Sequence, residues 1–212
     1  MRRLIPAVLA SLLLVPAAFA QDRSFDLTGN VVWLDPTGGG TFEDLTDPQD
    51  LEFDSEIGYG IAANIFFGGR ISTEFAIARV QPEATITRRR AVGTPGSGNL
   101  QITPVTAVLQ FHFAPNGFID PYVGAGAAYV LYEFDAQGVT NIDQIDFDDD
   151  VGLAVNAGLG IRLGNRFGIT LDGKYVPIES NATAVVVGTN QERSGEFDVS
   201  PIIISAGLSL RF

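Results

Sequence analysis

The chain has 212 residues and no cysteine, and its 13 basic and 25 acidic residues give a formal charge of −12. The lack of cysteine excludes a disulfide framework, a thiolate nucleophile and a cysteine-based metal site. The negative charge argues against nucleic acid as a partner, because phosphate binding needs a basic surface.

The first 20 residues have the pattern of a secretory signal peptide. Arg2 and Arg3 form a positive start, residues 4–17 are mostly apolar, and Ala18-Phe19-Ala20 is an A-x-A cleavage site. We therefore expect residues 1–20 to be removed on export and residues 21–212 to form one domain. No other stretch reaches the roughly 18 uninterrupted apolar residues of a membrane helix. A chain of this kind can span a membrane only as a closed barrel, because a bilayer offers no water to unpaired backbone groups.

Beyond the leader, apolar and polar residues alternate with the period of two that marks β-strands. Eight such runs cover residues 25–34, 55–67, 70–80, 101–113, 121–134, 151–163, 167–176 and 197–212. The connections after the second, fourth and sixth runs are short, and the others are long and polar. This pattern predicts an all-β fold, an eight-stranded antiparallel up-and-down transmembrane β-barrel, with both chain ends on the periplasmic side.

The two faces of each run predict which side meets lipid. In residues 151–163 every odd residue is apolar, whereas the even residues are small or polar and end at Arg162. A soluble lipocalin-type barrel would carry its apolar face inside and a charged face outside. The small and polar face suits a narrow lumen better than a solvated exterior, so we expect the apolar face to contact lipid.

Aromatic residues near the ends of the runs predict two interfacial belts. The periplasmic belt comprises Phe25, Phe67, Phe113, Tyr122, Phe167 and Phe212, and the opposite belt comprises Trp33, Tyr175 and Phe197.

The periodicity also predicts a polar layer inside the lumen. Its members are Asp26, Thr28, Asn30, Asn64, Glu74, Gln110, His112, Asn156, Arg162, Asp172, Lys174 and Arg211. Unpaired charges in so narrow a space are costly, so we expect the acids and bases among them to pair across the lumen. Two interpretations remain: a structural plug, or a gate on a permeation path.

Four prolines fall at nearly the same height along their runs, and each removes a ladder hydrogen bond. They are Pro82, Pro104, Pro177 and Pro201. They mark either strands that fray into loops or a lateral gap through which an apolar solute leaves the barrel wall.

Other polar groups give weaker signals. Arg88, Arg89 and Arg90 could contact lipopolysaccharide phosphates or form a solvated charge run. The acidic segment 143–150 could hold Ca²⁺, but it lacks the spacing of an EF-hand and is also explained as a solvated loop. The only histidine, His112, lies at the periplasmic end of its run, and no Gly-x-Ser-x-Gly motif is present, so we expect no catalysis, cofactor or metal.

Several segments resemble the OmpW family of small outer-membrane proteins. The resemblance rests on residues 109–113, LQFHF, and on 121–129, PYVGAGAAY, with support from 103–106, from 174–178 and from the terminal Arg-Phe. It implies an eight-stranded barrel with a narrow, largely apolar channel for small hydrophobic compounds, without cofactor or catalytic residues.

These observations together predict a monomer in the outer membrane of a Gram-negative bacterium. Its expected partners are the lipid bilayer, lipopolysaccharide, small hydrophobic solutes and, through Phe212, the barrel assembly machinery. The alternative is a non-transporting structural or receptor barrel whose extracellular loops bind partners or lipopolysaccharide.

Overall fold

The computed structural model describes residues 25–37, 39–42, 49–88, 96–137, 142–147, 149–186, 191–198 and 200–212. The predicted signal peptide, residues 1–20, lies outside these residues. No helix within the described part of the chain is long and apolar enough to cross a membrane.

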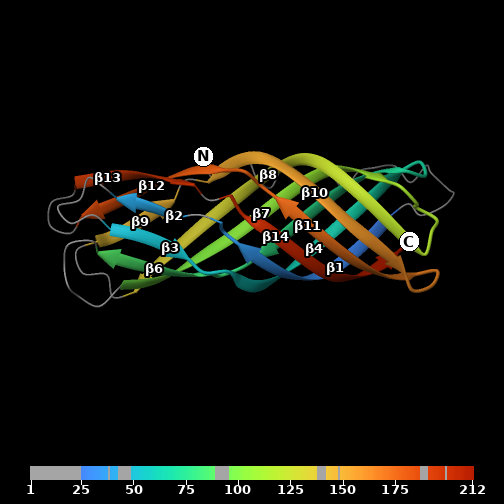
Figure 1. The fold of residues 1–212 in the computed structure, drawn as a ribbon, viewed down its shortest axis with the longest axis horizontal. Helices are drawn as coiled ribbons and strands as arrows, with labels where there is room; N and C mark the ends of the chain where they lie inside the picture. Colours follow the sequence, from blue (N-terminus) through green and yellow to red (C-terminus); the bar gives the residue numbers. More distant parts are fainter. Residues whose placement is uncertain are drawn as a thin grey trace.

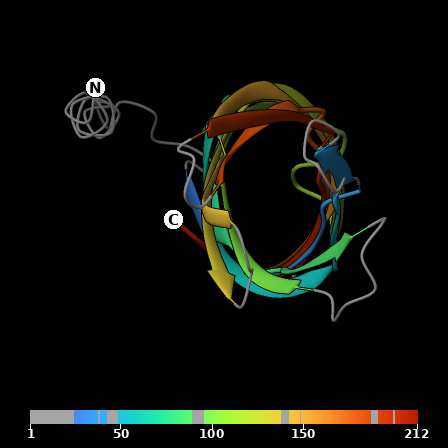
Figure 2. The same cartoon turned by 90° about the vertical axis from the view of Figure 1, so that its left-hand side faces the viewer.

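Eight antiparallel strands form a closed barrel in which each strand pairs with its neighbours in chain order (Figures 1 and 2). They are β1 (Phe25–Asp35), β4 (Glu56–Phe67), β5 (Ile71–Arg79), β7 (Gly96–His112), β8 (Ile119–Gln137), β10 (Asp150–Arg162), β11 (Phe167–Tyr175) and β14 (Ile202–Arg211). The first and last strands of the barrel pair from Asp26 with Arg211 to Asp35 with Ile202, and this pairing closes the ring. The predicted eight-stranded up-and-down barrel is confirmed.

Six shorter strands extend the sheet at the end opposite the C-terminus (Figure 1). They are β2 (Gly39–Phe42), β3 (Gln49–Phe53), β6 (Glu83–Arg88), β9 (Ile142–Phe147), β12 (Glu179–Val186) and β13 (Gln191–Asp198). From the sequence we predicted mainly polar connections at these segments. Outside a bilayer both faces of a strand can be polar, so the backbone pairing continues there without a hydrophobic alternation to reveal it.

The predicted last run, residues 197–212, is also divided. Its first residues belong to β13, and β14 begins only at Ile202, directly after Pro201. Proline has no backbone N–H and cannot donate to the ladder, which explains why the strand is broken there.

The side chains of the barrel strands face the predicted way. Val151, Leu153 and Leu208 point outward and are each about 70% exposed, whereas Ser209 and Arg211 point inward and are buried. An apolar exterior around a polar interior is the reverse of a soluble barrel and is suited to contact with acyl chains. The lipid-facing orientation is therefore confirmed.

One member of the predicted periplasmic belt lies elsewhere. Phe67, Phe113, Phe167 and Phe212 are exposed on the outer surface, as expected. Tyr122 is instead only 4% exposed and points into the lumen. The belt assignment of Tyr122 was wrong because it rested on position along the strand and ignored the alternation of faces.

Candidate functional site

The lumen is divided into two layers along the barrel axis. On every barrel strand with inward polar side chains, these lie toward the end with the short turns, which faces the periplasm in barrels of this kind. On β11, for example, Thr170, Asp172 and Lys174 point inward, and beyond the extracellular end of the strand they are followed by Val176 and Ile178. The change from polar to apolar occurs at a similar height on β1, β5, β7 and β14.

The polar layer is centred on an ion cluster. Lys174 Nζ lies 2.8 Å from Glu74 Oε1 and also contacts Asp172. Asp172 Oδ2 in addition accepts hydrogen bonds from Tyr122 Oη at 3.0 Å and from Asn156 Nδ2 at 2.8 Å. The five side chains come from β5, β8, β10 and β11, so the cluster ties together four strands around the ring.

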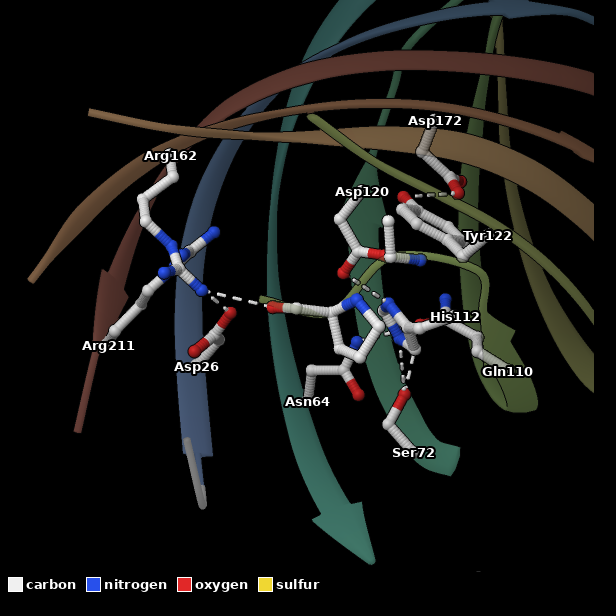
Figure 3. A network of polar contacts seen from close by, with 12 residues as sticks. Asp26, Asn64, Ser72, Gln110, His112, Asp120, Tyr122, Arg162, Asp172 and Arg211 are labelled. Carbon is white, nitrogen blue, oxygen red and sulfur yellow. Dashed lines mark hydrogen bonds and ion pairs between the residues drawn. The ribbon is translucent and has the colours of Figure 1, made fainter. Parts of the chain in front are cut away.

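A second group of polar contacts lies closer to the periplasmic end, on β4, β5, β7 and β8 (Figure 3). The His112 ring has Nδ1 2.8 Å from Asp120 Oδ2 and Nε2 2.9 Å from Ser72 Oγ. Gln110 Oε1 accepts a hydrogen bond from Asn64 Nδ2 at 2.7 Å and lies 3.4 Å from Ser72 Oγ. His112, Ser72 and Asp120 are all almost completely buried.

The arrangement Ser72–His112–Asp120 has the hydrogen-bond order of a serine hydrolase triad. In this structure, however, Ser72 has no exposed surface at all, and its hydroxyl is enclosed by His112 and Gln110. A substrate carbonyl has no approach to Ser72 Oγ in this closed lumen. The contacts among Ser72, His112 and Asp120 instead tie together β5, β7 and β8 at the periplasmic end of the barrel, which we call the barrel floor.

The two arginines of the predicted polar layer have different partners. Arg211 Nε lies 3.7 Å from Asp26 Oδ2, an ion pair between neighbouring strands (Figure 3). Arg162 Nη2 instead donates to the backbone carbonyl of Pro115 at 3.0 Å. The expectation that Arg162 pairs with an acid is therefore wrong: it is the last residue of β10, and its reach takes it to the β7–β8 turn.

The structure adds further residues to the polar layer, and three of them, Ser72, Asp120 and Tyr122, take part in its hydrogen-bond networks. Each lies on the inward face by simple alternation with residues that were identified, since Ser72 is two residues from Glu74 and Tyr122 is two from Gly124. Asp120 was assigned to a turn, but β8 begins one residue before it. Strict alternation, carried to the end of each strand, would have found all three.

The extracellular half of the lumen is a packed apolar layer. It comprises Val32, Leu34, Val80, Leu100, Ile102, Ala128, Val130, Tyr132, Ala154, Val176, Ile178 and Ile203, whereas Val108 of the same cluster pairs with Glu74 and lies in the polar half. Leu34, Leu100 and Ile102 have no exposed surface.

Two small cavities lie in the polar half and at its upper boundary. The upper one, about 40 Å³, has Glu74 and Lys174 on its polar side and Val32, Pro104 and Ile203 on its apolar side. The lower one, about 20 Å³, is lined by polar residues that include Asp26, Asn64, Glu74 and His112. Since one water needs roughly 10–15 Å³ measured in this way, the cavities have room for only a few waters. In the part of the chain that the structure describes, the polar half of the lumen is therefore nearly filled and the apolar half is packed.

The four prolines lie where the barrel passes into the outer strands. The ladder between β5 and β7 pairs Ile77 with Val105 and resumes only at the bridge between Val80 and Ile102, so the interruption includes Pro104. Above it, Leu100 N donates to Pro82 O at 3.0 Å and the wall is closed again.

The second pair of prolines, Pro177 and Pro201, marks another interruption of strand pairing, and we call both interruptions seams. β10 pairs with β11 only up to Val155 with Tyr175, although β10 continues to Asp150. Beyond this point the side chain of Ile178 lies against Gly152, where a Cβ atom would come within 2.7 Å of Ile178 Cγ1. Val176 N donates to Pro201 O at 3.2 Å and holds the other side of this segment.

The residues predicted to contact lipopolysaccharide and Ca²⁺ fall mostly outside what is described. The backbone of Arg88 ends β6, whereas Arg89 and Arg90 lie outside the described residues. Within the acidic segment, the Asp149 carboxylate accepts a hydrogen bond from Tyr129 Oη at 2.9 Å. Among the residues that the structure describes, no group of three or more His, Cys, Asp or Glu side chains could hold a metal ion.

Comparison with known proteins relates the chain to a family of membrane barrels. A sequence model of the OmpW family matches residues 28–212. The chain is 29% identical to the uncharacterized outer-membrane protein y4mB of Sinorhizobium fredii, over 77% of this chain and 69% of that protein. It is 27% identical to outer membrane protein W of Vibrio cholerae, over 84% of each chain.

Solved structures show the same fold. The outer membrane protein OprG of Pseudomonas aeruginosa superposes with a TM-score of 0.79, covering 91% of this chain and 97% of that one at 17% identity. The matched family, the relatives and the lipid-facing barrel agree with one another: this chain belongs to the OmpW family and is a β-barrel of the outer membrane.

Proposed function

We propose that this barrel is a narrow, gated path for the passive uptake of small hydrophobic molecules. The observation that supports this function best is the change of the inner wall from apolar on the extracellular side to charged on the periplasmic side. Burial of apolar surface stabilises a solute by about 25 cal/mol per Å², so the outer layer can attract an apolar molecule. The ion cluster below it repels the same molecule, because an apolar solute cannot replace the hydrogen bonds it would break.

A solute held above the ion cluster needs an exit other than the straight path. We infer that it leaves through the wall at one of the seams marked by Pro82 and Pro104 or by Pro177 and Pro201. Fewer ladder hydrogen bonds join the strands at these seams, so opening them costs less than opening a fully paired stretch. The upper cavity already reaches Pro104, which favours the seam between β5 and β7.

Solute uptake into liposomes tests the path itself. Ala78→Leu places a larger side chain at the upper cavity, which Ala78 lines, and should reduce uptake of an apolar solute several-fold. Ala157→Leu makes the same change on the exposed outer face of β10 and should leave uptake as in the wild type. Equal uptake by all three proteins would show that the lumen is not the path.

Two engineered disulfides test the exit. Arg79→Cys with Thr103→Cys closes the interrupted part of the β5–β7 ladder, and the chain has no other cysteine to interfere. Thr73→Cys with Leu109→Cys joins two residues that are already paired in the same ladder and serves as the control. We expect oxidation to stop uptake only in the first protein, and uptake that survives its closed disulfide would rule this exit out.

The role of the ion cluster is tested separately. Glu74→Ala with Asp172→Ala should raise the flux of small polar solutes if the cluster gates the lumen. Unchanged flux would leave the cluster with the role of a structural plug.

The closed lumen also favours a second function, that of a structural or receptor barrel. The six strands of the outer extension form a surface beyond the barrel, and the sequence run Arg88–Arg90 carries three positive charges. On this hypothesis, Arg88→Gln, Arg89→Gln and Arg90→Gln together should weaken binding to lipopolysaccharide without changing apolar uptake.

A further inference from the structure

The short turns of the barrel carry positive charge only. Within residues 68–70, 113–118 and 163–166 the charged side chains are Arg70 and Arg166. Both are exposed, and neither guanidinium makes a hydrogen bond or an ion pair with another residue that the structure describes. The strands of the outer extension, at the opposite end, carry mainly acids. The short turns are therefore the part of the described chain that favours an anionic partner.

A groove lies between two of these turns, at the end of the barrel where the C-terminus lies (Figure 1). Gly69 and Arg70 line it from the β4–β5 turn, and residues 113–117 line it from the β7–β8 turn. Its volume is about 330 Å³, much larger than the cavities of about 40 and 20 Å³ in the lumen. No acidic side chain lines it, so Arg70 contributes its only charge.

The wall of the groove on the β7–β8 side is held in place by hydrogen bonds. Gly117 N donates to Ala114 O at 2.8 Å, and Ala114 N donates to Asp120 Oδ1 at 3.2 Å. The guanidinium of Arg162 donates to Pro115 O at 3.0 Å from the neighbouring strand β10. A turn that is fixed before a ligand arrives loses little conformational freedom on binding, which favours a binding site over a surface depression.

The opposite wall is joined to the same strand. His112 N, at the end of β7, donates to Arg70 O at 2.8 Å. This bond keeps the backbone of Arg70 beside the β7–β8 turn, so that the groove lies along the junction of β5 and β7.

An apolar strip adjoins the groove on the outer surface. Phe113 lines the groove itself and is 51% exposed, and its ring lies 5.3 Å from that of Phe111. Ile71 pairs with Phe111 across β5 and β7 and is also exposed. These side chains belong to the face that contacts acyl chains. A cationic group beside an apolar strip matches an amphiphile better than it matches a soluble anion.

We propose that this groove binds the headgroup of an anionic phospholipid from the inner leaflet of the outer membrane. The Arg70 guanidinium pairs with the phosphate, for which its planar fork of donors is well shaped. The side-chain amide of Asn116 offers both donors and an acceptor to the hydroxyls of a glycerol headgroup. The acyl chains lie over Phe113, Phe111 and Ile71.

The charges of the groove also select the headgroup. Phosphatidylglycerol presents one phosphate and neutral hydroxyls, which match one guanidinium and one amide. Phosphatidylethanolamine adds an ammonium, for which the groove provides no acid. The bound lipid joins the β4–β5 turn to the β7–β8 turn from outside the lumen. The site therefore does not depend on whether a solute passes through the barrel.

Native mass spectrometry of the purified protein in a neutral detergent measures lipid binding directly. Phosphatidylglycerol and phosphatidylethanolamine with the same acyl chains are added separately, and the fraction of protein that retains one lipid is followed against lipid concentration. A charge-assisted pair contributes about 1.5–3 kcal/mol, so we expect phosphatidylglycerol to bind about tenfold more tightly or better. Equal binding of the two lipids would overturn the proposal.

Two arginine variants locate the site. Arg70→Gln should lower the affinity for phosphatidylglycerol to about that for phosphatidylethanolamine. Arg166→Gln removes the same charge from an exposed position on the β10–β11 turn and should bind as the wild type does. Binding that is unchanged in Arg70→Gln, or reduced equally in both variants, would show that only general attraction between charges is at work.

A water-soluble competitor separates a lipid from a free phosphate ester. Glycerol phosphate carries the charged group without acyl chains and should not displace phosphatidylglycerol at equal concentration. Displacement would assign the groove to a soluble anion and would contradict the proposal.

A further variant keeps the proposal testable if Arg70→Gln does not fold, which the heat-dependent mobility of the barrel on a gel reveals. Phe113→Ala retains every charge but removes apolar surface beside the groove, and it should weaken binding of phosphatidylglycerol several-fold. Unchanged binding in this variant would exclude acyl contact at the groove. None of these measurements follows solute flux, so a failed uptake experiment leaves the lipid site intact.

Discussion

Lys174 and Glu74 form an ion pair across the full width of the barrel, with Nζ 2.8 Å from Oε1. Lys174 lies on β11 and Glu74 on β5, and three barrel strands separate these two on either side of the ring. A contact between opposite walls fixes the diameter of the barrel at this height, which pairing between neighbouring strands cannot do alone.

Breaking this contact should be costly. Lys174→Met leaves Glu74 and Asp172 as neighbouring buried acids, and we expect a loss of about 3–5 kcal/mol in the free energy of unfolding. Adding Glu74→Gln and Asp172→Asn should restore most of the loss, because neutral side chains leave no charge uncompensated. Urea unfolding in lipid vesicles, followed by the fluorescence of the single tryptophan, Trp33, measures both. Equal stability of the single and triple variants would contradict this account.

Two glycines of β10 should differ sharply in their tolerance of a methyl group. A Cβ at Gly158 would lie 2.4 Å from the ring of Tyr122 and 2.5 Å from the carbonyl oxygen of Leu171. The nearest atom to a Cβ at Gly160 is 3.7 Å away. We therefore expect Gly158→Ala to destabilise the barrel by about 1–3 kcal/mol and Gly160→Ala by less than about 0.5 kcal/mol. The same unfolding assay compares the two variants. A loss of stability in Gly158→Ala as small as that in Gly160→Ala would show that Tyr122 can move aside.

The hydroxyl of Tyr122 should contribute to stability through Asp172. Tyr122→Phe removes a buried hydrogen bond to a carboxylate, a change that costs about 1.5–3 kcal/mol. Tyr175→Phe makes the same change at an exposed position on the outer surface and should have little effect on unfolding. A negligible loss in Tyr122→Phe would mean that Asp172 finds another donor.

The terminal aromatic residue should matter for assembly more than for stability. The ring of Phe212 is 65% exposed, and its centroid lies 5.7 Å from that of Phe25. If the barrel assembly machinery recognises Phe212, Phe212→Ala should lower the amount of protein in the outer membrane of cells while the purified chain refolds in detergent as before. Phe167→Ala, at a similarly exposed ring, is the control, and equal yields of both variants would exclude the recognition.

Much of the barrel could be predicted from the sequence because lipid and lumen impose opposite requirements on adjacent residues. The alternation from Val151 to Leu163 therefore revealed both the strand and its orientation. The outer strands gave no such signal, because both faces of a strand beyond the bilayer can be polar. Residues 179–186 and 191–196, for example, were assigned to a connection although they belong to the paired strands β12 and β13.

The contacts inside the lumen were harder to predict than its composition. Alternation places Arg162 and Lys174 on the same face, but it cannot tell which of them meets an acid. The reach of each side chain and the height of its strand decide that, and these depend on the stagger between β10 and β11. The opposite error was made for Tyr122. It was assigned to the outer aromatic belt, although the alternation of faces points its side chain into the lumen.

Among the strands that the structure describes, β7 and β8 form the longest ladder. This ladder runs without a shift of register from Ser97 with Gln137 to His112 with Tyr122. The hairpin therefore connects the outer end of the sheet to the periplasmic end of the barrel by one continuous ladder. We expect a molecule that displaces the outer end of this hairpin also to shift His112, Gln110 and Tyr122. Binding outside the cell would then alter the structure at the periplasmic end of the barrel.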